Sequence, residues 1–428
     1  MYPKFYHAYP LANFNFDILH GIIPQFAADL YVSPDGDNTN TGLTPEEPLK
    51  TIRHALIVIA EDSLNLFTIH LAEGTYSPSA NGEEFPLTMA EYVYLSGPSD
   101  GEAIIDAEQT NRVITIQDIV DIKLSNLTIQ GGSISDGAGI YCYNASPVLE
   151  NLVIRENYAG DDGGGIFCYN NSSPVLENVL LTNNTSQSSG GALYAGNSTS
   201  PVIHNSQMVD NAAYYGGGIW ANQSSMELQN VLIAGNEATY SGGGISAESY
   251  SSITLNQVTI KENEAETGGG IYNGYSSSIV FDDTDRSNIF FNFAVTGKEI
   301  YSTEFMEVVV DTFTVLYPNE FFVFPLENFS FDILNYKYEQ INADLYVSPE
   351  GDDENGGMSP DDPLKTIYGA FARIVADSLN QNTVYLMEGI YGPSYNGESF
   401  PLNVMDWVSI AGLSQHLVIL NGEDQSGI

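Results

Sequence analysis

Residues 137–157 read Gly-Ala-Gly-Ile-Tyr-Cys-Tyr-Asn-Ala-Ser-Pro-Val-Leu-Glu-Asn-Leu-Val-Ile-Arg-Glu-Asn. This segment holds three short alternating runs: Gly-Ile-Tyr-Cys-Tyr at 139–143, Pro-Val-Leu-Glu at 147–150 and Leu-Val-Ile-Arg at 152–155. Alternation with β-branched residues predicts strands, and the Asn and Ser-Pro residues between the runs predict turns. The segment therefore predicts three short strands joined by tight turns.

The pattern recurs with a period of about 26 residues. A glycine-rich anchor that ends in Ile or Leu occurs at 137–140, 163–166, 190–193, 216–219, 242–245 and 268–271, and decays at 297–300. Two asparagine series keep step with it. The first is Asn151, Asn178, Asn205, Asn230 and Asn256, and the second is Asn157, Asn184, Asn211, Asn236, Asn263 and Asn292.

This period is too short for a propeller blade and lacks a helical pattern, so each repeat predicts one coil of a parallel β-helix. Adjacent coils should stack at roughly 4.8 Å with like residues above like, so that the asparagines form hydrogen-bonded ladders. Less regular runs between 67 and 129 predict earlier coils, and Thr51–Ala60 predicts a short amphipathic helix over the open end of the stack. The fold class is thus all-β, a right-handed parallel β-helix with three strands per coil and an N-terminal capping helix.

A longer period of 315 residues divides the chain. Asp29-Leu-Tyr-Val-Ser-Pro-Asp-Gly-Asp37 returns as Asp344-Leu-Tyr-Val-Ser-Pro-Glu-Gly-Asp352, and even Tyr2-Pro3 returns as Tyr317-Pro318. We therefore expect a connector at 1–28, a first unit at 29–301 (cap module 29–110, regular coils 111–301), a closing segment and connector at 302–343, and a truncated second unit at 344–428. The chain is expected to be part of a longer tandem array, with its signal peptide and anchor outside this sequence.

Charge and composition exclude several functions. The chain of 428 residues has 12 Lys and Arg against 55 Asp and Glu, a net charge of −43. Binding to nucleic acid or to an anionic membrane surface is excluded by the scarcity of cations. Polyanionic sugars would be repelled unless divalent cations bridged them. No apolar run reaches membrane-spanning length, and the two cysteines cannot make a disulfide framework.

Two sets of motifs resemble known families. Tyr31-Val-Ser-Pro-Asp-Gly-Asp37 followed by Pro48-Leu-Lys-Thr-Ile52 resembles the N-terminal cap module of secreted bacterial right-handed β-helix proteins of the pectate-lyase-like superfamily. The Gly-Gly-Gly-Ile repeats resemble those of chlamydial-type polymorphic outer-membrane proteins. The resemblance implies an extracellular or cell-surface location, but the superfamily includes lyases, hydrolases and adhesins.

The residue after each anchor should point outward, because side chains alternate along a strand. Six of these seven outward residues are aromatic, the exception being Ser246. They are Tyr141, Phe167, Tyr194, Trp220, Tyr272 and Tyr301. We call these six rings the aromatic stripe and expect them to bind a glycan, each ring stacking flat on a successive sugar. Two alternatives stay open: the rings only stabilise the outer face, or another unit or partner covers them.

The acidic loop 35–46 predicts a metal site. Asp35, Asp37 and Glu46 occupy positions 1, 3 and 12 of an EF-like spacing, and oxygen ligands at that spacing suit Ca²⁺. The alternative is that Asp and Asn are ordinary turn residues here. Calcium is the only cofactor that the sequence indicates.

No catalytic residue can be assigned from the sequence. Asp161-Asp162 and Asp282-Asp283 are candidate acid pairs for glycoside hydrolysis, but both fall in predicted turns. Cys142 and Cys168 should form a small buried thiol pair.

The regular coils favour a structural or binding role, because a catalytic site normally breaks a repeat. The leading hypothesis is a secreted or cell-surface, adhesin-like β-helix that binds a polysaccharide or a surface protein and is extended by neighbouring tandem units. The alternative is a polysaccharide lyase or glycoside hydrolase of the pectate-lyase-like superfamily.

Overall fold

One coil shows how the repeat folds. The strand β13 (Ile166–Tyr169) is followed by β14 (Val175–Glu177), a bend at Asn178 with φ 55°, then β15 (Leu180–Thr182) and the short β16 (Thr185–Ser186). A glycine turn then starts the next coil. Each strand pairs in parallel with its counterpart one coil away, for example Ile166 with Leu193. The predicted parallel β-helix is confirmed.

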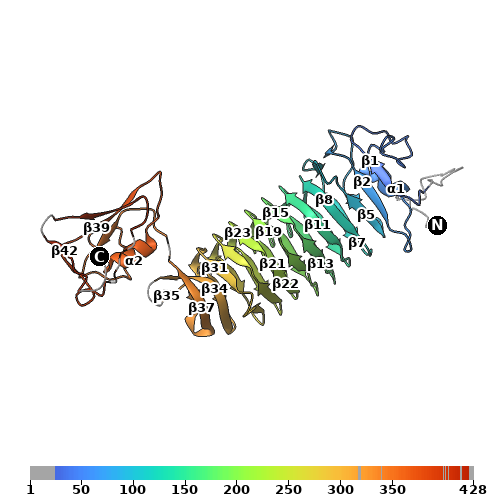
Figure 1. Ribbon diagram of the computed structural model, residues 1–428. Coiled ribbons are helices and arrows are strands. Elements are labelled where there is room, and N and C mark those ends of the chain that lie inside the picture. Colours follow the sequence, from blue (N-terminus) through green and yellow to red (C-terminus); the bar gives the residue numbers. More distant parts are fainter. Residues whose placement is uncertain are drawn as a thin grey trace.

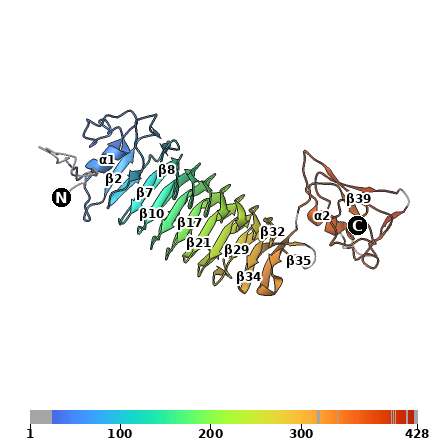
Figure 2. The same ribbon diagram turned by 180° about the vertical axis from the view of Figure 1, so that it is seen from behind.

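The computed structural model describes residues 25–316, 320–338, 340–398, 400, 402, 404–414 and 417–423. Most of the predicted connector 1–28, and the pair Tyr2-Pro3 and Tyr317-Pro318, lie outside these residues. Figures 1 and 2 show a long stack of coils from β1 to β37, followed by a smaller, separate body that contains α2. No helix in the described part of the chain is long and apolar enough to span a membrane.

Three sheets run along the stack within the described residues. Sheet 1 has 20 strands: β1 (Leu30–Val32), β2 (Phe67–Leu71), β3 (Gly74–Tyr76), β5 (Val93–Ser96), β6 (Ala103–Asp106), β8 (Lys123–Gln130), β11 (Val148–Arg155), β14, β15, β18 (Val202–His204), β19 (Gln207–Val209), β22 (Ser225–Gln229), β23 (Leu232–Ala234), β26 (Ser252–Asn256), β27 (Thr259–Lys261), β30 (Ser278–Phe281), β31 (Ser287–Phe290), β34 (Met306–Leu316), β35 (Glu320–Phe321) and β37 (Phe329–Lys337). Sheet 2 has ten strands: β4 (Leu87–Thr88), β7 (Ile114–Gln117), β10 (Ile140–Tyr143), β13, β17 (Leu193–Gly196), β21 (Ile219–Asn222), β25 (Ile245–Glu248), β29 (Ile271–Asn273), β33 (Ile300–Ser302) and β36 (Val323–Phe324). Sheet 3 has seven: β9 (Ser133–Ile134), β12 (Tyr158–Ala159), β16, β20 (Ala212–Tyr215), β24 (Glu237–Ser241), β28 (Glu264–Thr267) and β32 (Phe293–Thr296).

The three sides of the coil do not correspond one to one to the three alternating runs of the sequence. The second and third runs, at 147–150 and 152–155, form the single strand β11 and share sheet 1. The third side is sheet 3, whose strands follow the second asparagine series. Its strands are short and carry few apolar residues, which is why the alternation pattern did not reveal them.

The two asparagine series behave differently. Four members of the first series are exposed and bend the backbone: Asn151, Asn178, Asn205 and Asn230 have φ between 49° and 55°. At the last coil Asn256 is half-buried, and Gln257 is the left-handed residue. The second series is buried, and we call it the buried ladder. Within it each amide Nδ2 donates to the Oδ1 of the next asparagine, as from Asn184 to Asn211 at 3.0 Å.

The glycine turns let successive coils approach closely. Gly242 opens its turn with φ 66°, a left-handed conformation that glycine adopts without strain. A Cβ on Gly243 would lie 2.4 Å from the Glu264 carbonyl oxygen and 2.5 Å from that of Gly269. Any larger residue at this position would therefore push the next coil away.

The first helix, α1 (Ile52–Val58), covers the N-terminal end of the stack, as predicted. Its buried residues Ile52, Ala55 and Val58 join the core of the coils. The buried Glu83 carboxylate accepts hydrogen bonds from the amides of Ile52 at 2.7 Å and Arg53 at 2.9 Å. A carboxylate that is 30 residues away along the chain from Arg53 thus accepts the hydrogen bonds of the first helix amides.

The segment 302–343, predicted to close the first unit, adds strands to the stack. β34 pairs with β31, and β37 pairs with β34 in parallel from Met306↔Phe329 to Thr314↔Lys337. β36 likewise pairs with β33 in sheet 2.

The smaller body repeats the architecture of the cap. It has its own core, and α2 (Ile367–Arg373) is again capped by a buried glutamate, Glu398, through the amides of Ile367 and Tyr368. Its strands are β38 (Leu345–Val347), β39 (Asn382–Leu386), β40 (Gly389–Tyr391), β41 (Val408–Gly412) and β42 (Val418–Leu420).

Candidate functional site

The aromatic stripe lies on the outer face of sheet 2. The strands of sheet 2 pair in register, so that Tyr141 aligns with Phe167, Phe167 with Tyr194 and Tyr194 with Trp220. Consecutive ring centroids in this group lie 5.3, 4.6 and 4.6 Å apart. The inward neighbours Cys142, Cys168, Ala195, Ala221 and Ala247 are all fully buried. The inward and outward assignment of this strand is therefore correct.

The rings of the stripe stack on one another rather than lie flat on the surface. The interplanar angles in the first group are 7°, 19° and 26°. Each inner ring is therefore covered on both faces, and Phe167 and Tyr194 are only 8% exposed. Successive sugars cannot stack face-on against these two rings, so the expected binding geometry was wrong for the middle of the stripe. What the surface presents there is ring edges and tyrosine hydroxyls.

The stripe has neighbours that the sequence did not reveal. The Arg112 guanidinium lies 4.2 Å from the Tyr141 ring centroid and donates to the Asp136 backbone carbonyl at 2.7 Å. At the other end, Phe324 of β36 extends the stripe beyond Tyr301, with the centroids 6.0 Å apart. Arg112 lies outside the glycine repeat, and Phe324 follows an irregular segment, so neither was visible as a repeated position.

Ser246 interrupts the stripe. It aligns with Trp220 on one side and Tyr272 on the other. Stacking resumes between Tyr272 and Tyr301 at 5.1 Å with an interplanar angle of 1°. The stripe is therefore two stacks, and the ring faces of Trp220 and Tyr272 that point toward Ser246 carry no aromatic neighbour among the described residues.

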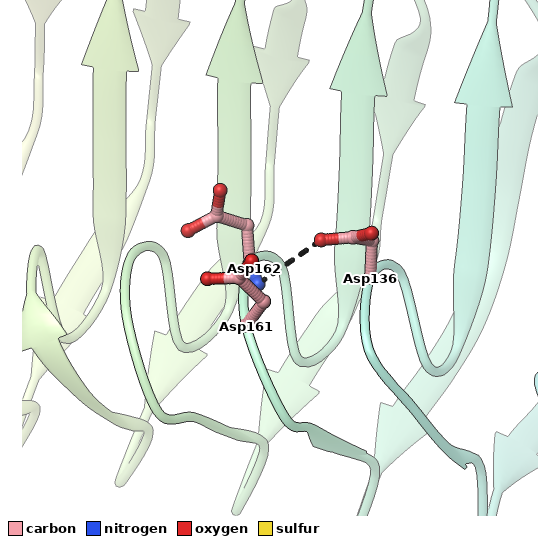
Figure 3. A group of neighbouring side chains, drawn as sticks. All are labelled: Asp136, Asp161 and Asp162. Carbon is pink, nitrogen blue, oxygen red and sulfur yellow. Dashed lines mark hydrogen bonds between the residues drawn. The ribbon is translucent and has the colours of Figure 1, made fainter.

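Three aspartates gather beside the first stack, in the turns that lead from sheet 3 to sheet 2 (Figure 3). One carboxylate oxygen from each of Asp136, Asp161 and Asp162 lies within 4.8 Å of the others. The Asp162 amide donates to Asp136 Oδ1 at 3.4 Å, and burial raises the pKa of the Asp162 carboxyl. Carboxylates at this spacing could hold a divalent cation such as Ca²⁺.

The sequence identified Asp161-Asp162 as an acid pair but missed Asp136. The three come together because one coil of 26 residues places Asp136 directly beside Asp162. The second candidate pair differs: Asp282 accepts hydrogen bonds from the amides of Thr284 and Asp285, both at 2.8 Å, and serves as a turn residue.

The three acids of the predicted calcium loop are not gathered around one point in this structure. Asp35, Asp37 and Glu46 are exposed, and they are not among the described acids that converge within ligating distance. Asp37 Oδ1 accepts a hydrogen bond from the Thr39 amide at 2.8 Å, which lowers the pKa of that carboxyl. Side-chain to backbone hydrogen bonds thus shape the loop, and calcium binding there stays a prediction.

The two cysteines are buried, free thiols in adjacent coils, as predicted. The hydrogen bond to Cys142 and burial raise the pKa of Cys168, so the Cys168 thiol is not activated as a nucleophile.

A buried acid ends the buried ladder. Glu299 accepts a hydrogen bond from Asn292 Nδ2 at 2.6 Å and one from the Asn292 amide at 3.4 Å, as the next asparagine would. Burial raises its pKa to about 7. Glu299 occupies the position that is the last glycine of the anchor in other coils. The sequence therefore showed that the repeat changes at 297–300, but it did not show the role of Glu299.

Comparisons with known proteins agree with this architecture. The family model described as "Right handed beta helix region" matches residues 108–260. The chain is therefore a right-handed parallel β-helix over its regular coils, as the sequence indicated.

Two curated relatives and one solved structure are similar to parts of the chain. The uncharacterized protein YwoF of Bacillus subtilis is 33% identical over 138 residues, 30% of this chain and 28% of that protein. Pectate lyase PEL9 of Emericella nidulans is 30% identical over 149 residues, 31% of this chain and 34% of that protein. The crystal structure of pectate lyase Pel9A is 15% identical with a TM-score of 0.41, covering 66% of this chain and 78% of that one. The matched segments thus span about a third or less of the length of the curated relatives.

Proposed function

We propose that this β-helix binds a polysaccharide along the aromatic stripe, in a secreted or cell-surface setting. The observation that carries the proposal is the pair of ring stacks on sheet 2, bordered by Arg112 and by the acid cluster. Ring edges, phenol hydroxyls and carboxylates in a row suit a polymer with repeated hydroxyl groups and C–H surfaces. With a net charge of −43, a neutral or cationic polymer is favoured over a polyanion.

The chain's own tryptophans allow a direct test. The sequence has two, and Trp220 lies in the stripe whereas Trp407 lies in the smaller body. In a Trp407→Phe background, the fluorescence of Trp220 should change on titration with a bound polysaccharide. Trp220→Ala should then abolish binding in a gel-retardation assay, whereas Trp407→Phe should leave it unchanged. Retention of full binding by Trp220→Ala, or no binding across neutral, cationic and uronate polymers, would contradict the proposal.

A second candidate function is polysaccharide cleavage. Its support is the sequence similarity to a pectate lyase together with the cluster of Asp136, Asp161 and Asp162 next to the stripe. Cation-bound carboxylates beside a basic group such as Arg112 could neutralise an acidic sugar. The test is release of oligosaccharides from a panel of polymers with EDTA or millimolar Ca²⁺. Products that disappear in Asp161→Asn would support cleavage, whereas no products under either condition would remove it.

A further inference from the structure

At Ser246 the stripe has a serine where both neighbouring coils have an aromatic ring. Adjacent coils lie roughly 4.8 Å apart, so Trp220 and Tyr272, two coils apart, are separated by about twice that spacing. A stack needs a third ring midway between them, and Ser246 supplies none. Trp220 and Tyr272 therefore flank the serine on both sides, and the serine side chain is fully covered in this structure.

Unpaired polar groups lie at this position. The Ser246 Oγ is fully shielded from solvent and has no hydrogen-bond partner among the residues that the structure describes. Glu248, two residues further along the same strand and on the same face, is half-buried, and its carboxylate has no partner among the described residues. Burial raises the pKa of this carboxyl. Buried polar groups are normally paired, so both groups are suited to partners that come from outside the chain.

Further aromatic rings lie near the carboxylate. Tyr215 and Tyr240 are in edge contact at 5.6 Å, near the ends of β20 and β24, the strands that precede Trp220 and Ser246 in the chain. The Glu248 charge contributes to the raised pKa of Tyr272, about 12, after the larger effect of burial, and also to that of Tyr215. A carboxylate among aromatic rings is an environment that favours an organic cation over a neutral group.

We propose that the interruption at Ser246 binds one amino-sugar unit of a polysaccharide, with its ring between Trp220 and Tyr272 and its ammonium group on Glu248. This inference rests on the proposed polysaccharide binding and names the chemical class of the ligand. The net charge of −43 would attract a polymer that carries many ammonium groups. Because Ser246 is covered, binding requires the partly buried side chains of Trp220 and Tyr272 to rotate apart and uncover the serine hydroxyl.

The first experiment compares glucosamine oligomers with their N-acetylated forms, which lack the charge. Binding is followed by Trp220 fluorescence in the full chain carrying Trp407→Phe. Glu248→Gln should weaken binding of the amine form about tenfold or more and leave the acetylated form unchanged. The matched control Glu227→Gln removes an exposed acid on sheet 1 and should change neither affinity. Equal losses in the two variants, or equal affinity of the wild type for both oligomers, would overturn the amino-sugar site.

A second variant tests the position itself. Ser246→Tyr places a ring where every neighbouring coil has one, so the coil should fold while the gap is filled. Selectivity for the amine form should disappear, and weaker binding along the rest of the stripe should remain. Unchanged selectivity would exclude this position as the site. If the wild type binds the two forms equally well, only this inference fails, whereas loss of all polysaccharide binding removes the proposed function too.

Discussion

At the level of single residues, the buried ladder makes the coils interdependent. Asn211 Nδ2 donates to Asn236 Oδ1 and to the Leu181 carbonyl, both at 3.0 Å, while its Oδ1 accepts from the Asn184 amide and Nδ2. Removing this side chain leaves several buried donors and acceptors without partners. Each such group costs roughly 1–3 kcal/mol.

We therefore expect Asn211→Ala to lower the free energy of unfolding by about 3 kcal/mol or more. The matched variant Asn230→Ala removes an exposed member of the first asparagine series, whose φ is 53°. It should cost about 1 kcal/mol, because alanine tolerates the left-handed region poorly. Urea unfolding followed by circular dichroism measures both. Equal losses would show that the buried ladder has no special role.

Glu299 predicts a pH dependence of stability. Its pKa rises from 4.5 in the unfolded chain to about 7 in the folded one, so the folded state binds the proton more tightly. Its contribution is complete below pH 4.5 and is lost as the pH rises through 7. The shift corresponds to about 3 kcal/mol.

Glu299→Gln cannot ionise and keeps an oxygen acceptor for Asn292. The variant should become more stable relative to the wild type as the pH rises from 4.5 to 8. Thermal melts of both proteins across this range test the prediction. Parallel pH profiles would mean that burial does not shift the pKa of Glu299.

At the level of elements, α1 depends on an acid that is remote in the sequence. Glu83 accepts hydrogen bonds from the first amides of the helix, which have no partner within it. Glu83→Ala should lower the stability of the cap by about 2 kcal/mol or more. The neighbouring Glu84 is exposed and forms an ion pair with the exposed Arg53, so Glu84→Ala should cost less than about 1 kcal/mol.

Hydrogen exchange of the 52–58 amides provides the measurement. Faster exchange in Glu83→Ala than in Glu84→Ala is expected. Indistinguishable exchange would show that helix packing alone holds the N-terminal cap.

At the scale of the whole molecule, two cores of unequal size should unfold separately. The first unit combines sheets of 20, 10 and 7 strands, whereas the described part of the second has sheets of three and two. Its buried residues form a core distinct from that of the coils. We expect a broad-specificity protease to cleave first within 344–428 and then to trim the chain to a resistant fragment that ends near Lys337. Mass spectrometry identifies the fragment, and trimming of the coils before this tail would contradict the prediction.

The sequence by itself determined the repeat of one coil per 26 residues, the direction of the side chains in sheet 2 and the two asparagine series, but not sheet 3. These follow from local alternation and a constant period, because stacking copies each position onto the next coil. The same two features predict that Cys142 and Cys168 are neighbours in adjacent coils, and they predict the order of the rings in the aromatic stripe.

Only the tertiary structure decided how those side chains meet. Ring planes depend on side-chain rotamers, so face-on stacking between Phe167 and Tyr194 replaced the expected open platform. Asp136, Arg112 and Glu299 acquired their partners from other coils or irregular segments, at distances along the chain that no repeated motif marks. The sequence of the repeat shows that Ser246 replaces an aromatic residue. That its hydroxyl is buried and unpaired depends on the neighbouring coils that enclose it.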